Sequence, residues 1–202
     1  METLIENIPT TFLADKIYSV EEYLEIEEVS SEKHYFFNGN VIKMPGAKFT
    51  HNLIATNITT ALNIALETKS RQYSVLNSDM KIYIPRIVSF VYPDAVVVCD
   101  EPEYYNGRQD IISNPLLIVE VLSLSTEDYD RTTKFWEYKQ IPSFKEYVLV
   151  EQNMPFVTAT FKADERTWQD TEAESLESSI YLKSIDCTID LKKIYKGIKF
   201  GN

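Results

Sequence analysis

The hydrophobic and polar positions along the chain change period several times, and each change marks an element. From residue 52 to 67, apolar residues recur every three or four positions, which predicts an amphipathic helix. The period then shortens to that of strands in segments 74–85, 91–100 and 115–123, the last two of which are almost continuously apolar. Such strands are typical of the middle of a sheet that is covered on both faces.

The pattern continues in the same manner towards the C-terminus. Segment 127–138 predicts a second helix, and segment 146–152 predicts another buried strand. Segment 155–170 predicts a hairpin with a polar turn, and the tail from residue 179 alternates as a strand and ends in several lysines. The order helix, three strands, helix, strand predicts an α/β fold with a mixed sheet.

Two strong local signals lie near the N-terminus. Ser19 and Glu22 have the spacing of a capping box, which predicts a short acidic helix over residues 19–28. Asn38 and Gly39 stand between two apolar runs and predict a β-hairpin, since both turn residues must accept a positive φ.

The chain has the length and composition of one globular domain. It has 202 residues, of which 44% are hydrophobic and 25% are charged. We find no repeat, low-complexity tract or linker, so we predict a single domain over residues 1–202. Within it we expect an N-terminal helix and hairpin in residues 1–48, a core in residues 49–151, and a C-terminal hairpin and tail in residues 152–202.

The net charge of −11 excludes a protein that covers nucleic acid with its whole surface. Any contact with nucleic acid must therefore be local. Cys99 and Cys187 are far apart in the sequence and form no Cys-x-x-Cys motif, which favours a reducing cytoplasm over a disulfide or zinc framework. No apolar run reaches the length of about 20 residues that a membrane-spanning helix needs, so we expect no membrane contact.

Two carboxylates stand in segments that should exclude water. Asp94 follows a proline at the start of one apolar strand, and Glu120 lies within the run LLIVEVL. An unpaired carboxylate there would be costly to desolvate. For either residue alone, a structural role, as a buried salt bridge or as a strand-end carboxylate that reaches water, is as well favoured as a functional one. If the two strands are neighbours, both acids can instead bind one magnesium ion, with waters completing its shell.

The helix that follows Glu120 carries cations at helical spacing. Glu127, Arg131, Lys134 and Tyr138 are four, three and four residues apart and share one face of a regular helix. A metal between carboxylates with a lysine nearby is suited to hydrolysing a phosphodiester. A solvated face with local ion pairs is the commoner outcome, and the pattern alone favours that interpretation.

The complete arrangement resembles a known nuclease superfamily. A Pro-Asp pair at one strand, a glutamate on the next and a basic helix behind it resemble the PD-(D/E)XK nucleases, which have the restriction-endonuclease-like fold. Four segments are more closely similar to a large bacterial endonuclease family within it: YPDAVVVCDEPEYY, LLIVEVLSLST, DYDRTTKFWEY and FKEYVLVEQ. The similarity extends from about Ser19 to Phe200. It implies a restriction-endonuclease-like core with a mixed central sheet flanked by helices, an N-terminal helix and hairpin, and a C-terminal β extension.

The resemblance also implies roles for residues. Asp94 and Glu120 correspond to the family's metal-binding acids. The lysine usually found two residues after the second acid is replaced by Leu122, and the resemblance implies that Lys134 on the following helix takes its place. At a position where relatives have a further glutamate this chain has Tyr35. A neutral phenol is a poor magnesium ligand, so this copy is expected to be weakened or inactive if that acid is needed.

Three further residues are weaker candidates. His51 matches a family histidine just before the long helix, where a cap or a surface role is favoured over a metal ligand, and binding of phosphate is a further alternative. Asp79 is a third acid near the metal or, as we favour, an acceptor at a strand edge. Arg131 is the second cation of the helix face. Tyr138 and Trp136 are expected in the core or an interface, and the C-terminal lysines are expected on a solvated helix face.

Three functions remain after these arguments. The leading hypothesis is a magnesium-dependent endonuclease, with manganese as an alternative ion, that hydrolyses DNA and contacts it weakly and locally. The second is a catalytically weakened or inactive protein of the same fold that binds nucleic acid or another protein. A metal-free hydrolase acting on a sugar or a small phosphate is the least favoured. We expect a homodimer, since symmetric dimers are the commonest assembly.

Overall fold

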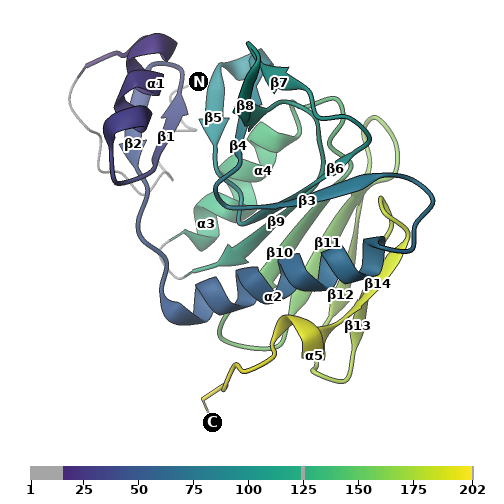
Figure 1. The fold of residues 1–202 in the computed structure, drawn as a ribbon. Helices are drawn as coiled ribbons and strands as arrows, with labels where there is room; N and C mark the ends of the chain where they lie inside the picture. Colours follow the sequence, from purple (N-terminus) through teal and green to yellow (C-terminus); the bar gives the residue numbers. More distant parts are fainter. Residues whose placement is uncertain (1–15, 124–125, 202) are drawn as a thin grey trace.

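A six-stranded mixed sheet forms the centre of the molecule, in a computed structural model that describes residues 16–123 and 126–201 (Figure 1). Its strand order is β12-β11-β10-β9-β6-β3. Strands β9 and β10 are parallel and every other neighbouring pair is antiparallel, so the mixed sheet predicted from the sequence is confirmed. The strands span Tyr73–Asn77 (β3), Ala95–Cys99 (β6), Pro115–Leu122 (β9), Glu146–Glu151 (β10), Val157–Lys162 (β11) and Trp168–Ala173 (β12).

A second six-stranded sheet and a small hairpin complete the β-structure. The second sheet has the order β2-β1-β5-β4-β8-β7, and β13 pairs with β14. The strands span His34–Phe37 (β1), Asn40–Lys43 (β2), Lys81–Ile84 (β4), Ser89–Val91 (β5), Tyr104–Tyr105 (β7), Arg108–Ile112 (β8), Ser179–Leu182 (β13) and Cys187–Asp190 (β14). A short 3-10 helix, η2 (Pro85–Ile87), joins β4 to β5.

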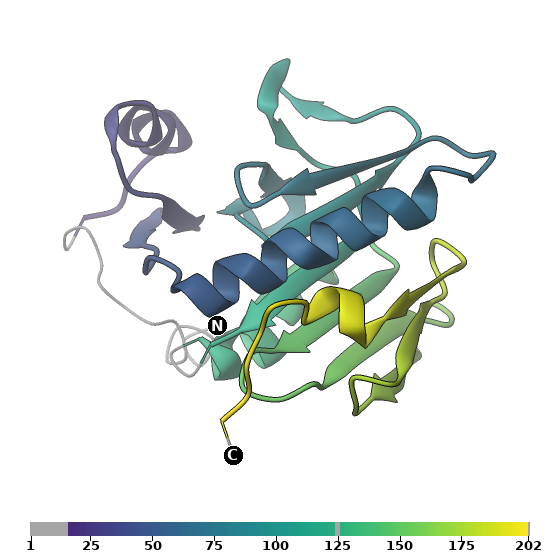
Figure 2. The same ribbon diagram turned by 60° about the horizontal axis from the view of Figure 1, so that its bottom comes forward.

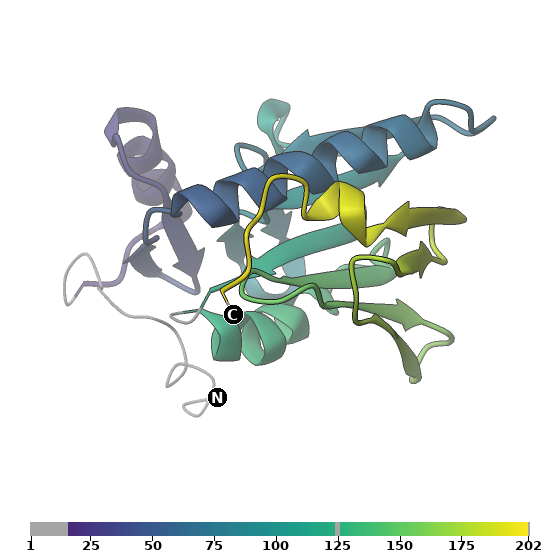
Figure 3. The same ribbon diagram turned by 90° about the horizontal axis from the view of Figure 1, so that it is seen from below.

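Helices cover both faces of the central sheet (Figure 3). Helix α2 (Phe49–Leu66) and the short α5 (Leu191–Ile194) pack on one face, and the helical segment after β9 packs on the other. The alternation of strand side chains produces these two cores. On β9, Val119 and Val121 face α2, while Ile118 and Leu122 belong to the core under the other helix.

Several local predictions are confirmed. Helix α1 (Val20–Val29) begins with the Ser19–Glu22 capping box, and Asn38 and Gly39 turn the β1–β2 hairpin with positive φ values of 43° and 90°. The β11–β12 hairpin forms where it was predicted. Helix α2 begins three residues earlier than predicted, so His51 lies in its first turn and not before it.

One predicted strand is wrong. Segment 74–85 is not continuous, because the backbone turns at residues 78–79 and the Met80 amide donates to the Asn77 carbonyl at 3.1 Å. Strand β3 then pairs with β6 in the central sheet, while β4 pairs with β5 and β8 in the second sheet. The second sheet as a whole was not predicted, since β5 and β7 are only three and two residues long.

The helix predicted over residues 127–138 is interrupted. It consists of α3 (Glu127–Tyr129), a π-helical turn η3 (Asp130–Lys134) and α4 (Phe135–Tyr138). The wider π turn rotates the residues after it relative to a regular helix, and such turns are frequent at functional sites. Within the described ranges, none of the helices is both long and apolar enough to cross a membrane.

Candidate active site

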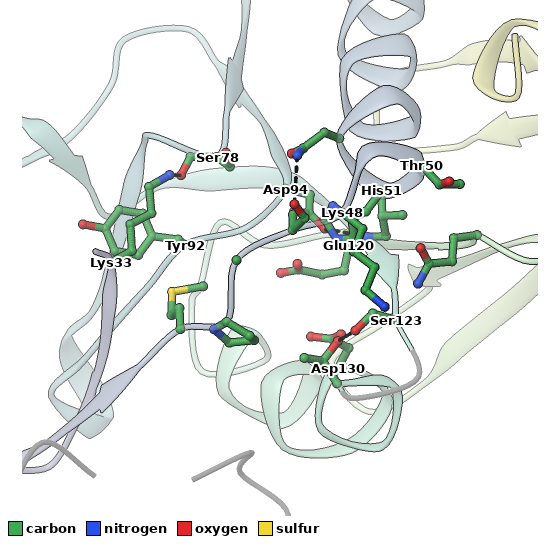
Figure 4. A pocket seen from close by; sticks show the side chains of 18 of the residues that line it. Lys33, Lys48, Thr50, His51, Ser78, Tyr92, Asp94, Glu120, Ser123 and Asp130 are labelled. Atoms are coloured by element: carbon green, nitrogen blue, oxygen red, sulfur yellow. Dashed lines mark hydrogen bonds and ion pairs between the residues drawn. The ribbon is translucent and has the colours of Figure 1, made fainter. Parts of the chain in front are cut away.

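Strand pairing places Asp94 and Glu120 on the same face of the central sheet. Ala95 on β6 pairs with Val119 on β9 in an antiparallel ladder, so Asp94, one residue before Ala95, lies opposite Glu120, one residue after Val119. Both side chains face the helical segment α3–α4, because residues two positions along each strand belong to the core under that helix. Asp94 is fixed by the Val121 amide, which donates to its Oδ2 at 2.7 Å. Figure 4 shows the two acids together beneath the start of α2.

Glu120 is buried but has two polar partners. Only 2% of the residue is exposed. The Lys134 Nζ lies 2.8 Å from its Oε1, and the Tyr138 hydroxyl donates to the same oxygen at 2.7 Å. Burial raises the pKa of the Glu120 carboxyl to about 8, and the Lys134 ammonium opposes this shift. Lys134 and Tyr138 both contact Oε1, so Oε2 is the oxygen through which Glu120 could bind a cation.

Lys134 is a buried cation enclosed by acids. Its Nζ lies 3.4 Å from Asp130 Oδ1 in addition to its contact with Glu120. Burial acts to lower the pKa of this ammonium, but the charges of Glu120, Asp130 and Asp94 outweigh burial and raise it above its ordinary value. Lys134 therefore stays protonated and is the fixed positive charge of the cluster.

His51 reaches the cluster from the first turn of α2. Its Nε2 lies 3.2 Å from Asp94 Oδ2. Burial lowers the pKa of the imidazole, but the hydrogen bond and the charge of Asp94 raise it above its ordinary value overall. His51 and the Val121 amide thus both contact Asp94 Oδ2, which is a closer involvement of His51 than the cap or surface role favoured from the sequence.

These side chains line one cavity of about 1000 Å³. Asp94, Glu120, Asp130, Lys134 and His51 all contribute to its wall. The helix α2, the β1–β2 hairpin and the end of β9 frame the opening, and Figure 4 shows Lys33 and Tyr92 across the cavity from the acids. The cluster is therefore accessible to a ligand although its central carboxylate is buried.

Two sequence candidates lie outside this cluster. The side chain of Asp79 is 79% exposed and pairs with Lys33 at 2.8 Å, which agrees with the favoured role of a strand-edge acceptor. Arg131 pairs with Glu127 at 2.9 Å and also with Glu151 on β10. Arg131 and Lys134 both lie in the π turn but pair with different acids, so they do not form the common cationic face expected from the sequence.

A second buried acid, Glu137, escaped the sequence arguments. It lies on α4 and is fully buried. The Tyr35 hydroxyl donates to its Oε1, and the Ser89 hydroxyl donates to its Oε2 at 3.2 Å. Tyr35 also lines the cavity, so the phenol stands between the cavity and this hidden carboxyl. In the sequence, Glu137 was marked only by its place next to Tyr138 on the predicted helix. Asp130 was marked only by its place four residues before Lys134.

We predict that Glu137 makes stability depend on pH. Burial raises the pKa of its carboxyl from 4.5 to about 7, although Tyr35 and Ser89 oppose the shift. Between these values the folded state keeps a proton that the unfolded chain has lost, so the free energy of unfolding falls as pH rises. Urea unfolding in EDTA should show that Glu137→Gln gains about 3 kcal/mol relative to wild type across this window.

The exposed acid Glu165 provides the control for this measurement. Its side chain is 91% exposed on the turn between β11 and β12, so Glu165→Gln should follow the wild-type pH curve. Parallel curves for Glu137→Gln and wild type would show that Glu137 ionises as freely in the folded protein as in the unfolded chain.

The donor set suits a magnesium ion better than an all-protein metal cage. Within the described part of the chain, no three His, Cys, Asp or Glu side chains group into a metal site of their own. Magnesium is usually held by one or two carboxylates, with waters and substrate phosphates as its other ligands. Asp94 and Glu120 supply two such carboxylates on the wall of an open cavity, so the residues present fit this ion.

Comparison with known proteins identifies relatives over most of the chain. The Uma2 family model, described as "Putative restriction endonuclease", matches residues 20–191. Two Synechocystis proteins (strain ATCC 27184 / PCC 6803 / Kazusa) are similar. "Uncharacterized protein sll1609" is 38% identical, covering 78% of this chain and 88% of its own length. "Uncharacterized protein slr1290" is 35% identical, covering 90% and 93%.

A solved structure has the same fold. It is the crystal structure of "a putative nuclease belonging to DUF820" from Anabaena variabilis ATCC 29413. It covers 89% of this chain and 98% of its own, with a TM-score of 0.69 and 14% sequence identity. This likeness supports the α/β nuclease-like fold predicted from the sequence.

Proposed function

Because this chain belongs to the Uma2 family, described as putative restriction endonucleases, we propose that it is a metal-dependent endonuclease that hydrolyses phosphodiester bonds of DNA. The observation that carries the proposal is the convergence of Asp94, Glu120 and Lys134 in one open cavity. Metal-dependent hydrolysis of a phosphodiester uses a hard cation and is assisted by a fixed positive charge near the scissile phosphate; Asp94 and Glu120 can hold the cation, and Lys134 can supply the charge.

Asp94 and Glu120 are the residues that would hold the ion. When bound, magnesium would make a coordinated water more acidic and neutralise charge that develops on the phosphate. Manganese has similar preferences for oxygen ligands and would serve the same purpose.

The protein's own residues act mainly by positioning. The Val121 amide and His51 both hold the Asp94 carboxylate through its Oδ2, and Tyr138 orients Glu120 through its hydroxyl. These contacts keep both carboxylates in place without reorganisation when substrate arrives, which lowers the barrier to the charged transition state. The Lys134 ammonium keeps its proton and supplies a positive charge on the cavity wall for a substrate phosphate.

A binding protein that has lost catalysis is the second candidate. It is favoured by the internal pairing of the cluster, because Lys134 and Tyr138 already satisfy Glu120 and His51 already contacts Asp94. In that case the cluster stabilises the fold, and the cavity binds nucleic acid or a partner without cleaving it. The cytoplasmic location and the homodimer expected from the sequence stay predictions.

Plasmid nicking decides between the two candidates. We expect the purified protein to convert supercoiled plasmid to the open circle with magnesium or manganese, and to leave it supercoiled in EDTA. Isothermal titration should show magnesium binding in the same buffer. A protein that neither nicks plasmid nor binds magnesium would be the binding module.

A further inference from the structure

Positive charge is concentrated around the cavity of an otherwise acidic molecule. The chain has a net charge of −11 and only 20 lysines and arginines. Five lysines nevertheless line this one cavity, Lys33, Lys43, Lys48, Lys134 and Lys199, against four acids, Glu32, Asp94, Glu120 and Asp130, so the lining has a small excess of positive charge. The rest of the chain is correspondingly more acidic, so a polyanion is attracted to the cavity and repelled by the surface around it.

Two of these lysines are available to bind a ligand. Lys33 pairs with Asp79, and Lys43 pairs with Glu32 at 2.6 Å. Lys48 and Lys199 are both exposed, and among residues 16–123 and 126–201 neither takes part in an ion pair within 4.0 Å. They come from opposite ends of the sequence and meet at the same cavity.

The C-terminal tail carries Lys199 to this place. After α5, the tail runs towards the end of the molecule where α2 begins (Figure 2). Asn57 on α2 fixes this path, because its Nδ2 donates to the carbonyl oxygens of Ile194 at 3.0 Å and Lys196 at 2.9 Å. Ile198 and Phe200, on either side of Lys199, pack against the core on the α2 side of the sheet, so tertiary contacts place this part of the tail.

An exposed aromatic ring stands beside Lys48. Phe49 is the first residue of α2 and is 80% exposed. Phe49 does not itself line the cavity, but its sequence neighbours Lys48 and Thr50 both do, so the backbone at Phe49 belongs to the segment that borders the cavity (Figure 4 labels both neighbours). A phenylalanine so exposed gains nothing for the fold, and an exposed ring next to a lysine is the combination that binds an unstacked base and its phosphate.

We infer that the cavity prefers a single DNA strand, or an unpaired stretch within a duplex, over intact double-stranded DNA. Lys48 and Lys199 bind backbone phosphates at the mouth, and an unpaired base stacks on Phe49. The acidic surface beyond the mouth disfavours the second strand of a duplex. This inference rests on the proposed function for the choice of DNA and adds to it the form of DNA that is recognised.

Fluorescence anisotropy tests the inference without cleavage. A labelled oligonucleotide and its duplex are titrated with the full-length protein in EDTA, so that binding is measured separately from metal-dependent hydrolysis. Wild type should bind the single strand more tightly. Phe49→Ala and Phe49→Leu should each weaken single-strand binding about tenfold, and Phe49→Trp should restore it, because base stacking needs an aromatic ring.

Matched controls separate stacking and phosphate contact from general surface effects. Ile64→Ala changes another exposed apolar residue of α2, 60% exposed, and should leave binding unchanged. Lys48→Ala and Lys199→Ala should each reduce the slope of log affinity against log salt by about 0.7 for a single strand. Lys192→Ala removes an exposed lysine that pairs with Glu177 outside the cavity and should leave the slope unchanged.

Two results would overturn the inference: tighter or equal binding of the duplex by wild type, or unchanged single-strand binding by Phe49→Ala. Neither depends on cleavage. If the nicking assay shows no metal-dependent activity while the Phe49 and lysine variants behave as expected, the nuclease proposal fails and the single-strand site stands. If nicking occurs but duplex is preferred, the reverse holds.

Discussion

Replacing Glu120 by glutamine, or Asp94 by asparagine, is expected to reduce metal-dependent DNA cleavage by at least about 100-fold. Each change keeps the shape of the side chain but replaces a carboxylate by a neutral amide, which is a weak ligand for a hard cation. The buried Lys134 ammonium keeps Asp130 as an ion-pair partner in both variants, so these variants should fold. The measurement is the initial rate of plasmid nicking at saturating magnesium, with magnesium affinity from calorimetry.

Asp79→Asn is the control for this prediction. Asp79 lies in the turn between β3 and β4. Its side chain is exposed, pairs with Lys33 and does not line the cavity that holds Asp94 and Glu120. It should nick plasmid at the wild-type rate. Equal activity in wild type, Asp94→Asn and Glu120→Gln would indicate a contaminating nuclease or a different site, and the proposed roles of both acids would be wrong.

The second large effect concerns the buried cation. Lys134→Met is expected to lower the free energy of unfolding by about 3–5 kcal/mol, because it leaves the Glu120 carboxyl buried without its cation. Lys134 is only 6% exposed, so methionine keeps most of its packing. Without the ammonium the pKa of Glu120 should rise beyond about 8, so the deficit should grow as pH rises above this value.

A double variant isolates the pair. Glu120→Gln combined with Lys134→Met removes both charges, and we expect it to be more stable than Lys134→Met alone by at least about 1 kcal/mol. Lys139→Met, at the exposed end of α4 over the Phe135 ring, should cost less than about 1 kcal/mol. If the two lysine variants lose the same stability in urea unfolding, Lys134 is not a buried partner of Glu120.

Local signals in the sequence determined most of the central architecture. The capping box at Ser19, the Asn38–Gly39 turn and the apolar period of α2 each depend on residues within a few positions of one another. The two central strands were predictable because a continuous apolar run has few alternatives to a buried strand. Asp94 and Glu120 stood out for the same reason, since each is a charge in such a run.

Only the tertiary structure decided which side chains meet. After the turn at residues 78–79, β3 pairs in the central sheet and β4 in the second sheet. Both strands have the same alternation of apolar and polar residues, so this alternation does not predict which sheet each strand joins. The packing of the helical segment after β9 brings Lys134 to Glu120 and leaves Arg131 paired with Glu127 and Glu151, which the spacing of the two cations does not show.

Long-range contacts had no signal in the sequence. Tyr35 and Glu137 are 102 positions apart and meet only because β1 and α4 border the same core. Lys48 and Lys199 come together through the Asn57 contacts that hold the tail on α2. The sequence by itself thus determined the central elements and the two acids, through interactions between near neighbours. The contacts of those acids, and the approach of Lys48 and Phe49 to Lys199, depend on packing between distant segments. The spacing of apolar residues within one segment does not predict such packing.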